Sequence, residues 1–354
     1  MSQWTWTRAA TVGVIDRRFA ALLLGLLAIA IVSTIIAIGV GAVEISPGTV
    51  IAIIRDAWSP GSTEPNWTLG QQHIVMDLRI PRAILGATVG AGLAIVGAVL
   101  QNITRNPLAD PYLFGVSSGA AVGAVTVILY TGSIIGLVTL PLAAFAGALM
   151  SMVLVFVLAF ETGGFGTERL VLTGVAVHFV LMAVTNLLIF NAREGSADGV
   201  LFWMLGSFGN ARWNVLVPPI LALILGFAWV LFRAPGLDAL SIGDEGAHTL
   251  GIDVKALRLE MFVATALMSG VFVSTSGAVG FVGLIVPHCA RWVVGARVAR
   301  SVPIAAVMGV IFTVWMDAAA RYALAPKELP LGVMTAAVGG VFLIIVLRQR
   351  RRMS

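Results

Sequence analysis

Long apolar runs alternate with short polar segments along almost the whole chain. A helix rises 1.5 Å per residue, so an apolar run of about 20 residues spans the roughly 30 Å hydrocarbon core of a bilayer. The pattern predicts an all-α polytopic membrane protein with about ten transmembrane helices. The expected spans cover residues 20–41, 82–101, 113–130, 138–160, 169–190, 215–232, 258–275, 277–294, 302–322 and 330–347.

Basic residues are distributed unevenly between the segments that join these spans. If the N-terminus is cytoplasmic, the inner segments hold 15 of the 22 Lys and Arg residues. Cytoplasmic loops carry such an excess of basic residues, so we expect both termini to be cytoplasmic. Residues 43–78 then form an extracytoplasmic loop and residues 233–257 a cytoplasmic loop. The apolar run of residues 20–41 is too long for a signal-peptide core, and we expect it to be a retained helix.

The composition indicates a chain that lies mostly in lipid, as one transmembrane domain over residues 1–354. The 354 residues are 59% hydrophobic and 11% charged, with a mean hydropathy of +0.99, whereas soluble domains are about 25% charged. The positive charge clusters beside apolar spans, which is typical of membrane orientation rather than of nucleic-acid binding. Cys289 is the single cysteine and the histidines are scattered, so we expect no disulfide and no metal site.

The stretch from Arg79 to Ala120 combines a helix rich in small residues with a sharp break. We expect Pro81 in the first turn of this helix, where a missing N–H is tolerated. Small residues recur from Ala83 to Gly97, and such residues let helix backbones approach closely in lipid. The QNITRNPLADP segment that follows cannot continue the helix because of its prolines.

The chain lacks the sequence that binds nucleotide phosphates. A P-loop needs Gly-Lys-Ser/Thr, and the two lysines, Lys255 and Lys327, follow Val and Pro. We therefore expect no ATP binding by this chain. The 233–257 loop carries residues suited to starting and ending two short helices. The starts are expected at Asp238, Asp244 and Glu245, and the turns at Gly243, Gly246 and Gly251.

Few charged residues lie deep in the predicted spans. Asp317 and Arg321 are four residues apart and are expected to pair. Glu260 lies within a turn of Arg258, and we expect it to pair there or to reach the headgroups. His288 has no ligand neighbour at helical spacing and is expected to pack. An ion-coupled transporter needs midplane carboxylates, and an intramembrane enzyme needs a nucleophile with a base or a metal cluster, so both functions are disfavoured.

Eight motifs follow one another in the order found in a known transporter family. They are RIPR, GAVLQ, RNPLADP and LFGVSSGA, then LFWMLGSFG, GDEGAHTLGID, GAVGFVGLIVPHCAR and ELPLGVMTAAVGGVFL. Over about residues 20–347 the chain resembles the FecCD-type permease subunits of ATP-binding-cassette (ABC) importers for iron-siderophores, haem and cobalamin. The resemblance implies the inverted-repeat permease fold of type II ABC importers, in the cytoplasmic (inner) membrane of a bacterium, with no catalytic residue.

The resemblance also implies an assembly around this chain. It consists of a permease homodimer, two ABC ATPase subunits that bind ATP and Mg, and an extracytoplasmic substrate-binding protein. Membrane lipid surrounds the dimer, and neither a cofactor nor a nucleic acid is expected on this chain. The expected cargo is a ferric siderophore, with haem and cobalamin as alternatives because nothing in the sequence separates them.

Three groups of residues match functional positions of the family. ATPase contact is expected at Asp244, Glu245, Gly246, Leu250 and Gly251. A cytoplasmic gate is expected at Asn106, Leu108, Thr167 and Glu168, although Glu168 stands where small hydroxyl residues are frequent. Docking of the binding protein is expected at Arg79, Arg82 and Arg321. The alternatives are, respectively, a solvated connector, ordinary helix capping, and anchoring to headgroups or pairing with Asp317.

Overall fold

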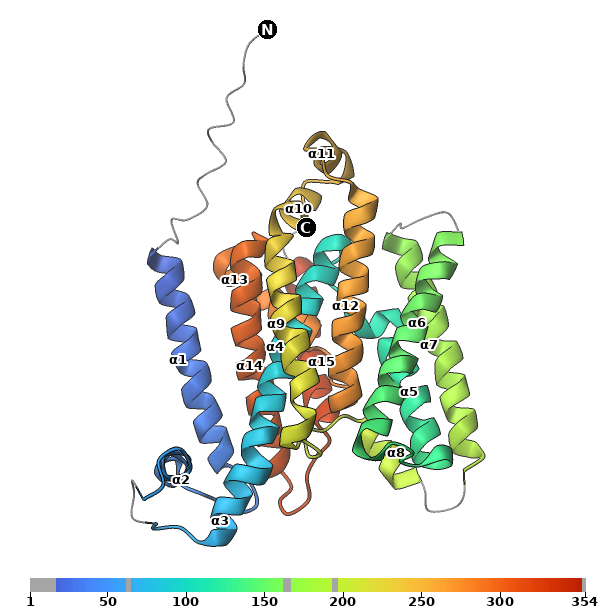
Figure 1. Cartoon of the computed structure of the whole chain (residues 1–354). Coiled ribbons are helices and arrows are strands. Elements are labelled where there is room, and N and C mark those ends of the chain that lie inside the picture. The colour runs from blue at the N-terminus through green and yellow to red at the C-terminus, as the bar shows by residue number, and fades with distance from the viewer. Residues whose placement is uncertain (1–16, 62–64, 162–166, 193–196, 352–354) are drawn as a thin grey trace.

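All regular elements are helices in the part of the chain that the computed structural model describes, residues 17–61, 65–161, 167–192 and 197–351 (Figure 1). Seven of these helical segments are long and apolar enough to cross a membrane, and three shorter apolar helices accompany them. The prediction of an all-α polytopic membrane protein is therefore confirmed. The long helices are α1 (Arg17–Gly39), α4 (Ile80–Ile103, preceded by α3 and η1), α6 (Thr139–Glu161), α7 (Thr167–Phe190), α9 (Val217–Phe232, preceded by η5), α12 (Val254–Ser276) and α14 (Val298–Tyr322). The helices with shorter apolar stretches are α5 (Val116–Thr126, continued by η3, Val127–Thr131), α13 (Val282–Val294) and α15 (Leu331–Arg351, apolar over Leu331–Val346).

Short helices lie between these segments. Outside the long helices, α2 ends at Trp58 and carries an apolar face that packs on the end of α1. The short elements are α2 (Pro47–Trp58), α3 (Leu69–His73), η1 (Ile74–Arg79), η2 (Pro111–Phe114), η4 (Gly136–Val138), α8 (Ala197–Met204), η5 (Trp213–Val215), α10 (Ala234–Leu240) and α11 (Asp244–Thr249).

The second predicted span begins earlier than its apolar pattern suggests. The helix runs without interruption from Leu69 through the π-helical turn η1 into α4. Pro81 lies in the first turn of α4, as expected, but the π turn η1 continues the helix ahead of it. A π turn loosens the hydrogen-bond ladder just ahead of Pro81, where the proline lacks an N–H to donate.

Helix α4 forms the centre of the bundle and packs against α9, α12, α13 and α14 (Figure 1). Glycines set how closely the neighbours approach. A Cβ on Gly97 would lie 1.9 Å from the carbonyl oxygen of Gly283 in α13, and one on Gly90 would lie 2.4 Å from that of Gly309 in α14. Only glycine fits at these crossings, so the predicted role of the small residues, close backbone packing, is confirmed.

The segment after α4 folds back into the bundle before α5 begins. The Asp110 carboxylate accepts a hydrogen bond from the N–H of Tyr112 at 2.9 Å and starts η2. Its other oxygen lies next to Gly283, opposite Gly97. Gly97 is roughly 9 Å before the end of α4, at 1.5 Å per residue. The break predicted at the prolines is therefore a re-entrant connection, and α5 is a shortened helix.

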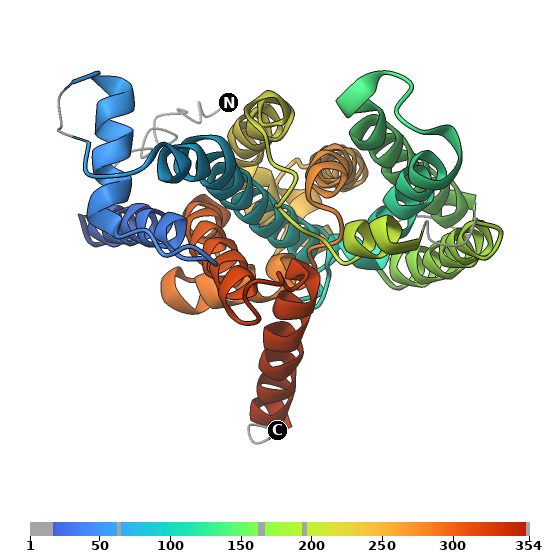
Figure 2. The ribbon, with the colours of Figure 1, turned by 90° about the horizontal axis from the view of Figure 1, so that it is seen from below.

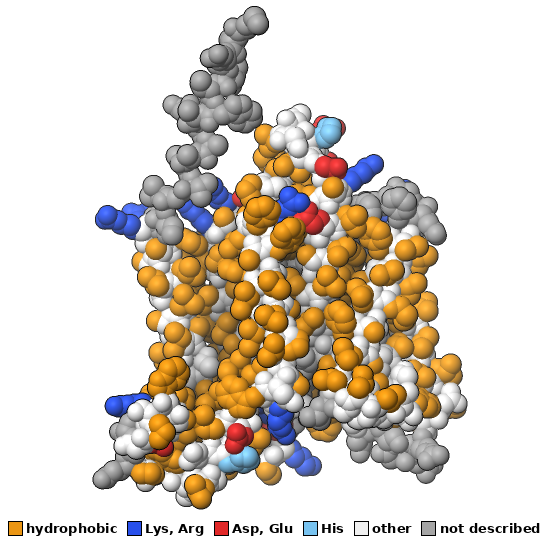
Figure 3. All heavy atoms as spheres, in the orientation of Figure 1, with side chains coloured by type: hydrophobic (Ala, Val, Ile, Leu, Met, Phe, Trp, Pro, Cys, Tyr) orange, Lys and Arg blue, Asp and Glu red, His pale blue; other side chains and the backbone are white. Residues whose placement is uncertain are grey.

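Charged side chains lie at both ends of the molecule, and the surface between them is apolar. Figure 3 shows charged side chains gathered beside α10 and α11 at one end and beside α2 and α3 at the other, with apolar side chains between them. Seen along the bundle, α15 projects away from the other helices (Figure 2). The end that carries α10 and α11 contains the candidate site.

Candidate functional site

The predicted pair of short helices in the 233–257 loop is present as α10 and α11, and α11 protrudes at one end of the molecule (Figure 1). Asp244 is the first residue of α11, after Gly243, whose φ of +115° suits only glycine. Gly251, with φ +79°, turns the chain toward α12. Two details of the prediction are wrong: Gly246 lies within α11, and Asp238 lies within α10, where it accepts a hydrogen bond from the N–H of Val298 at 2.7 Å.

Asp244 joins the protruding helix to two transmembrane helices. Its carboxylate lies 3.0 Å from Nη2 of Arg105, which follows α4, and 2.8 Å from Nη2 of Arg258 in α12. Arg258 also donates from Nε to the carbonyl of Ile103, the last residue of α4, at 3.2 Å. One partly exposed carboxylate thus holds α11, the end of α4 and the start of α12 together.

The other residues predicted to contact the ATPase lie in α11 or directly after it. Leu250 is 63% exposed, Ile242 is 71% exposed, and Glu245 and Gly251 are also exposed. Ala247 points inward and is fully buried. The protruding helix is therefore anchored on its inner side, and an exposed large apolar side chain lies next to each of its ends, Ile242 and Leu250.

Glu260 pairs with a different arginine from the one expected. Arg233, between α9 and α10, donates from Nε to Oε1 of Glu260 at 2.6 Å and also contacts Oε2. Arg258 is engaged by Asp244 instead, so a partner distant in sequence displaces the neighbour. The hydrogen bond to Glu260 raises the pKa of the Arg233 guanidinium above its usual value.

The predicted gate residues are only partly described. Asn106 accepts a hydrogen bond from the N–H of Leu108 at 3.0 Å, which fixes the turn after α4 and leaves the Leu108 side chain exposed. Thr167 and Glu168 form the first turn of α7, and their side chains lie outside the described residues. The gate hypothesis therefore stays a prediction for these four residues.

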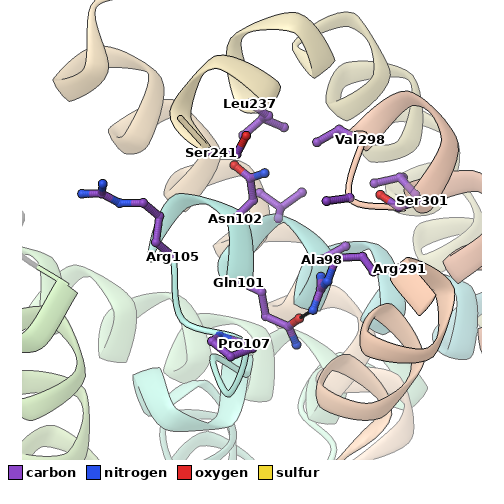
Figure 4. Close-up of a pocket in the computed structure, with 13 residues that line it drawn as sticks. Ala98, Gln101, Asn102, Arg105, Pro107, Leu237, Ser241, Arg291, Val298 and Ser301 are labelled. Carbon is purple, nitrogen blue, oxygen red and sulfur yellow. Dashed lines mark hydrogen bonds between the residues drawn. The ribbon is translucent and has the colours of Figure 1, made fainter. Parts of the chain in front are cut away.

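Gln101 and Arg291 form a contact that sequence reasoning missed (Figure 4). Pro287 in α13 lacks the N–H that would bond the carbonyl of Gly283 four residues earlier. The side-chain amide of Gln101 donates to this carbonyl at 2.9 Å and to that of Leu284 at 3.3 Å. The guanidinium of Arg291 donates to Oε1 of Gln101. Pro287 could have indicated this contact from the sequence. A proline within an apolar helix leaves one backbone carbonyl without its donor, so a buried side-chain donor is expected nearby.

The three arginines predicted to dock a binding protein are mostly buried. Arg79, which is 8% exposed, donates from Nη1 to the carbonyls of Ile38 and Gly39 at 2.8 and 2.9 Å and from Nη2 to that of Val43. Arg321, also 8% exposed, donates from Nη2 to the carbonyl of Ala37 at 2.8 Å. These carbonyls belong to the C-terminal end of α1 and the residues after it, where helix geometry leaves carbonyls unpaired and cations are favoured.

Asp317 balances the charge of this arginine cluster. It lies 3.0 Å from Nε of Arg321, which confirms the predicted pair, and 2.9 Å from Nη2 of Arg82. Arg82 also binds Glu328, beyond α14, at 2.8 Å. The cluster links α1, α4 and α14 at the end of the molecule opposite α11.

His288 packs between aromatic rings, with its ring centroid 4.6 Å from Trp292 and 6.0 Å from Phe342, as expected for a packing residue. Among the described residues, no group of three His, Cys, Asp or Glu side chains is arranged to hold a metal ion. The candidate site therefore consists of the anchored α11, the turn after α4 and the Gln101–Arg291 contact.

Comparison with known proteins places this arrangement among transporters. The chain is 41% identical to the cobalamin import system permease protein BtuC of Halobacterium salinarum over 79% of this chain and 74% of that protein. It is 34% identical to the hemin transport system permease protein HmuU of Yersinia pestis over 94% and 97% of the two chains. A structure of a metal-chelate type ABC transporter in an inward-facing conformation matches with a TM-score of 0.80 and 27% identity, over 93% of this chain and 99% of that chain.

The sequence also matches the FecCD transport family over residues 28–349. This match covers nearly the whole chain and includes both the arginine cluster and the anchored α11. The resemblance inferred from the motifs is thereby confirmed. The chain belongs to the FecCD transport family and is the membrane-spanning permease component of an ABC importer.

Proposed function

We propose that this chain works as a homodimeric permease that imports a ferric siderophore across the cytoplasmic (inner) membrane of a bacterium by alternating access. Two ABC ATPase subunits supply the energy, and an extracytoplasmic binding protein delivers the cargo. Ten helices span the membrane and both termini are cytoplasmic. The excess of basic residues on the side of α11 supports this orientation.

The anchored α11 is the observation that carries the mechanism. An ATPase that grips Leu250 and Ile242 would move α11, and Asp244 would pass this movement to α4 and α12 through Arg105 and Arg258. Because both arginines bind one carboxylate, the two helices would shift together. The turn at Asn106 and Leu108 lies directly after α4, so the same movement would widen or narrow the cytoplasmic gate.

The cargo proposal rests on what the relatives have in common. Their names refer to cobalamin, hemin and metal chelates, which are bulky molecules built around a bound metal. A ferric siderophore is the member of this class that we propose, with haem and cobalamin as alternatives. Specificity would lie mainly in the binding protein, and the permease would accept a range of chelates.

The dimer and the docking of the binding protein are further parts of the proposal. The projecting α15 exposes Val338, Val341 and Ile345, an apolar side that a second copy could cover (Figure 2). Docking by Arg79, Arg82 and Arg321 stays a prediction. Their burial against α1 and Asp317 favours a structural role, with Glu328 and the residues around it closer to the surface.

Transport by purified components tests the proposal. The permease is reconstituted in liposomes with its ATPase, and uptake of a ferric siderophore delivered by the binding protein is measured, with haemin and cobalamin as competitors. We expect ATP-dependent uptake of the siderophore and no uptake without the ATPase. Uptake driven by an ion gradient alone would contradict the ABC mechanism. Preferential uptake of haemin or cobalamin would identify that molecule, and not a siderophore, as the cargo.

A further inference from the structure

A cavity of about 290 Å³ lies between α10 and the bundle (Figure 4). Its walls come from the end of α4, from α10, from the end of α13 and from the start of α14. At roughly 30 Å³ per water molecule, it has room for about ten waters. This is too small for a metal chelate of the size of cobalamin.

The cavity lining carries positive charge without a carboxylate. Arg105 and Arg291 line it, and none of the lining residues is Asp or Glu. Arg105 is paired with Asp244, whereas no described carboxylate forms an ion pair with the partly buried Arg291. Asp238 is adjacent to the lining, where it accepts a hydrogen bond from the N–H of Val298 and has Arg297 as its nearby counter-charge. An arginine that is partly desolvated and not neutralised favours an anion beside it.

Other polar groups face the same space. Ser301 lies in the first turn of α14, at the positive end of a long helix, and its hydroxyl can donate. The Asn102 side-chain oxygen is buried and has no hydrogen-bond partner among the described residues. Gln101, 4% exposed, holds Arg291 in place. The cavity thus offers donors for anionic oxygens and one acceptor for a hydroxyl hydrogen.

We propose that this cavity is a binding site for a phosphate group, formed chiefly by Arg291, Ser301 and Asn102. The planar fork of arginine matches two phosphate oxygens, and a protonated phosphate or a headgroup hydroxyl would donate to the Asn102 oxygen. The phosphate comes either from free inorganic phosphate or from the headgroup of an anionic lipid. Because the cavity lies between α4, α10 and α14, its occupant would stiffen the contact between α10 and the bundle.

Two probes distinguish the sources. Thermal unfolding of the purified chain, followed by tryptophan fluorescence, is measured in phosphatidylcholine nanodiscs with rising inorganic phosphate, and with sodium chloride at matched ionic strength. Lipids retained by the chain are counted by native mass spectrometry after transfer from membranes with and without phosphatidylglycerol. A saturable phosphate-specific rise in Tm indicates free phosphate, and retained phosphatidylglycerol indicates a lipid headgroup.

Matched variants decide whether the response arises in the cavity. Arg291→Met should weaken the phosphate response at least about tenfold or abolish lipid retention, because the bidentate donor is lost. Arg17→Met, which removes an exposed arginine at the start of α1, outside the lining, should leave both unchanged.

A second pair keeps the test independent of the Gln101–Arg291 contact. Ala296 is exposed and lines the cavity, so Ala296→Glu supplies a competing carboxylate, whereas Ala299→Glu places the same charge on α14 outside the lining. We expect Ala296→Glu to fold normally and to lose the response, with Ala299→Glu unaffected. The proposal is overturned if neither probe binds the unmodified chain, or if the control variants lose the response equally.

Discussion

The two ends of α4 are both held by arginines, but the arginines are used in different ways. At the end near α1, Arg79 and Arg321 are buried and bind backbone carbonyls, and Asp317, with a side chain that is 5% exposed, balances Arg82 and Arg321. At the end near α11, Asp244 has a side chain that is 44% exposed, is shared by two arginines, and lies close to a cavity. The first arrangement resists rearrangement, whereas the second can exchange partners with water at little cost.

This contrast indicates a fixed end and a movable end of one central helix. Backbone carbonyls are fixed in position by the helix that carries them. The hydrogen bonds from Arg79 and Arg321 to the carbonyls at the end of α1 therefore hold α1, α4 and α14 together as a unit. The partly solvated ion pairs of Asp244 allow α11 to shift by small amounts while remaining attached. We infer that conformational change begins at the α11 end and that the arginine cluster acts as its support.

The largest effect is expected from removing the charge of Asp317. Asp317→Asn leaves Arg82 and Arg321 without their shared buried partner, and breaking such a pair costs about 3–5 kcal/mol. Unfolding in detergent should show a correspondingly lower stability. The matched control is Glu328→Gln, whose side chain is 45% exposed and which should cost less than about 1 kcal/mol. Equal, small losses in both variants would mean that this end is not fixed.

A smaller effect is expected from Gln101→Leu. This change leaves the carbonyl of Gly283 without a donor, which costs about 1–3 kcal/mol for a buried polar group. Pro287→Ala restores the backbone N–H that the helix lacks, so the double variant should recover part of the loss. The free energies of unfolding of the two single variants and of the double variant give the coupling energy between Gln101 and Pro287. Strictly additive losses would show that Gln101 does not compensate for the proline.

The smallest effect on stability is expected from Leu250→Ala, directly after α11. An exposed side chain contributes little to folding, so the stability should change by less than about 0.5 kcal/mol. Affinity for the ATPase should nevertheless fall by roughly fivefold or more, as for an apolar interface residue whose loss costs about 1 kcal/mol. Surface plasmon resonance with the purified ATPase measures this affinity. Unchanged binding in Leu250→Ala and Ile242→Ala together would place the contact elsewhere.

Local signals in the sequence predicted much of this arrangement. The length of the apolar runs predicted the long helices, and the polar and glycine residues of the 233–257 loop predicted two short helices. The four-residue spacing of Asp317 and Arg321 predicted their ion pair. Contacts between segments that are distant in the sequence could not be predicted from these local signals. Glu260 binds Arg233 rather than its neighbour Arg258, because folding brings the start of α12 against the end of α9.

The candidate site was predictable in its positions but not in its geometry. Arg79 and Arg321 were expected at the surface because they lie on the side of the membrane where basic residues are scarce. Such a count does not indicate burial, and both side chains are buried. Their carbonyl partners become available only where α1 ends, more than 30 residues before Arg79 in the sequence. Gln101 meets Gly283 across 182 residues, and only the proline in α13 hints that a donor is needed there.

The ratio of ATP hydrolysed to cargo imported by Asp244→Asn tests the central claim most directly. The variant keeps the size of the side chain and removes the charge that holds Arg105 and Arg258, so the link from α11 to α4 and α12 weakens. In liposomes with ATPase and binding protein, we predict that hydrolysis continues while uptake falls about tenfold, a coupling loss of the usual size. His248→Gln, which changes another exposed polar side chain of α11 that is not among the expected ATPase contacts, should keep the normal ratio. An unchanged ratio in Asp244→Asn would contradict the claim that Asp244 transmits the movement.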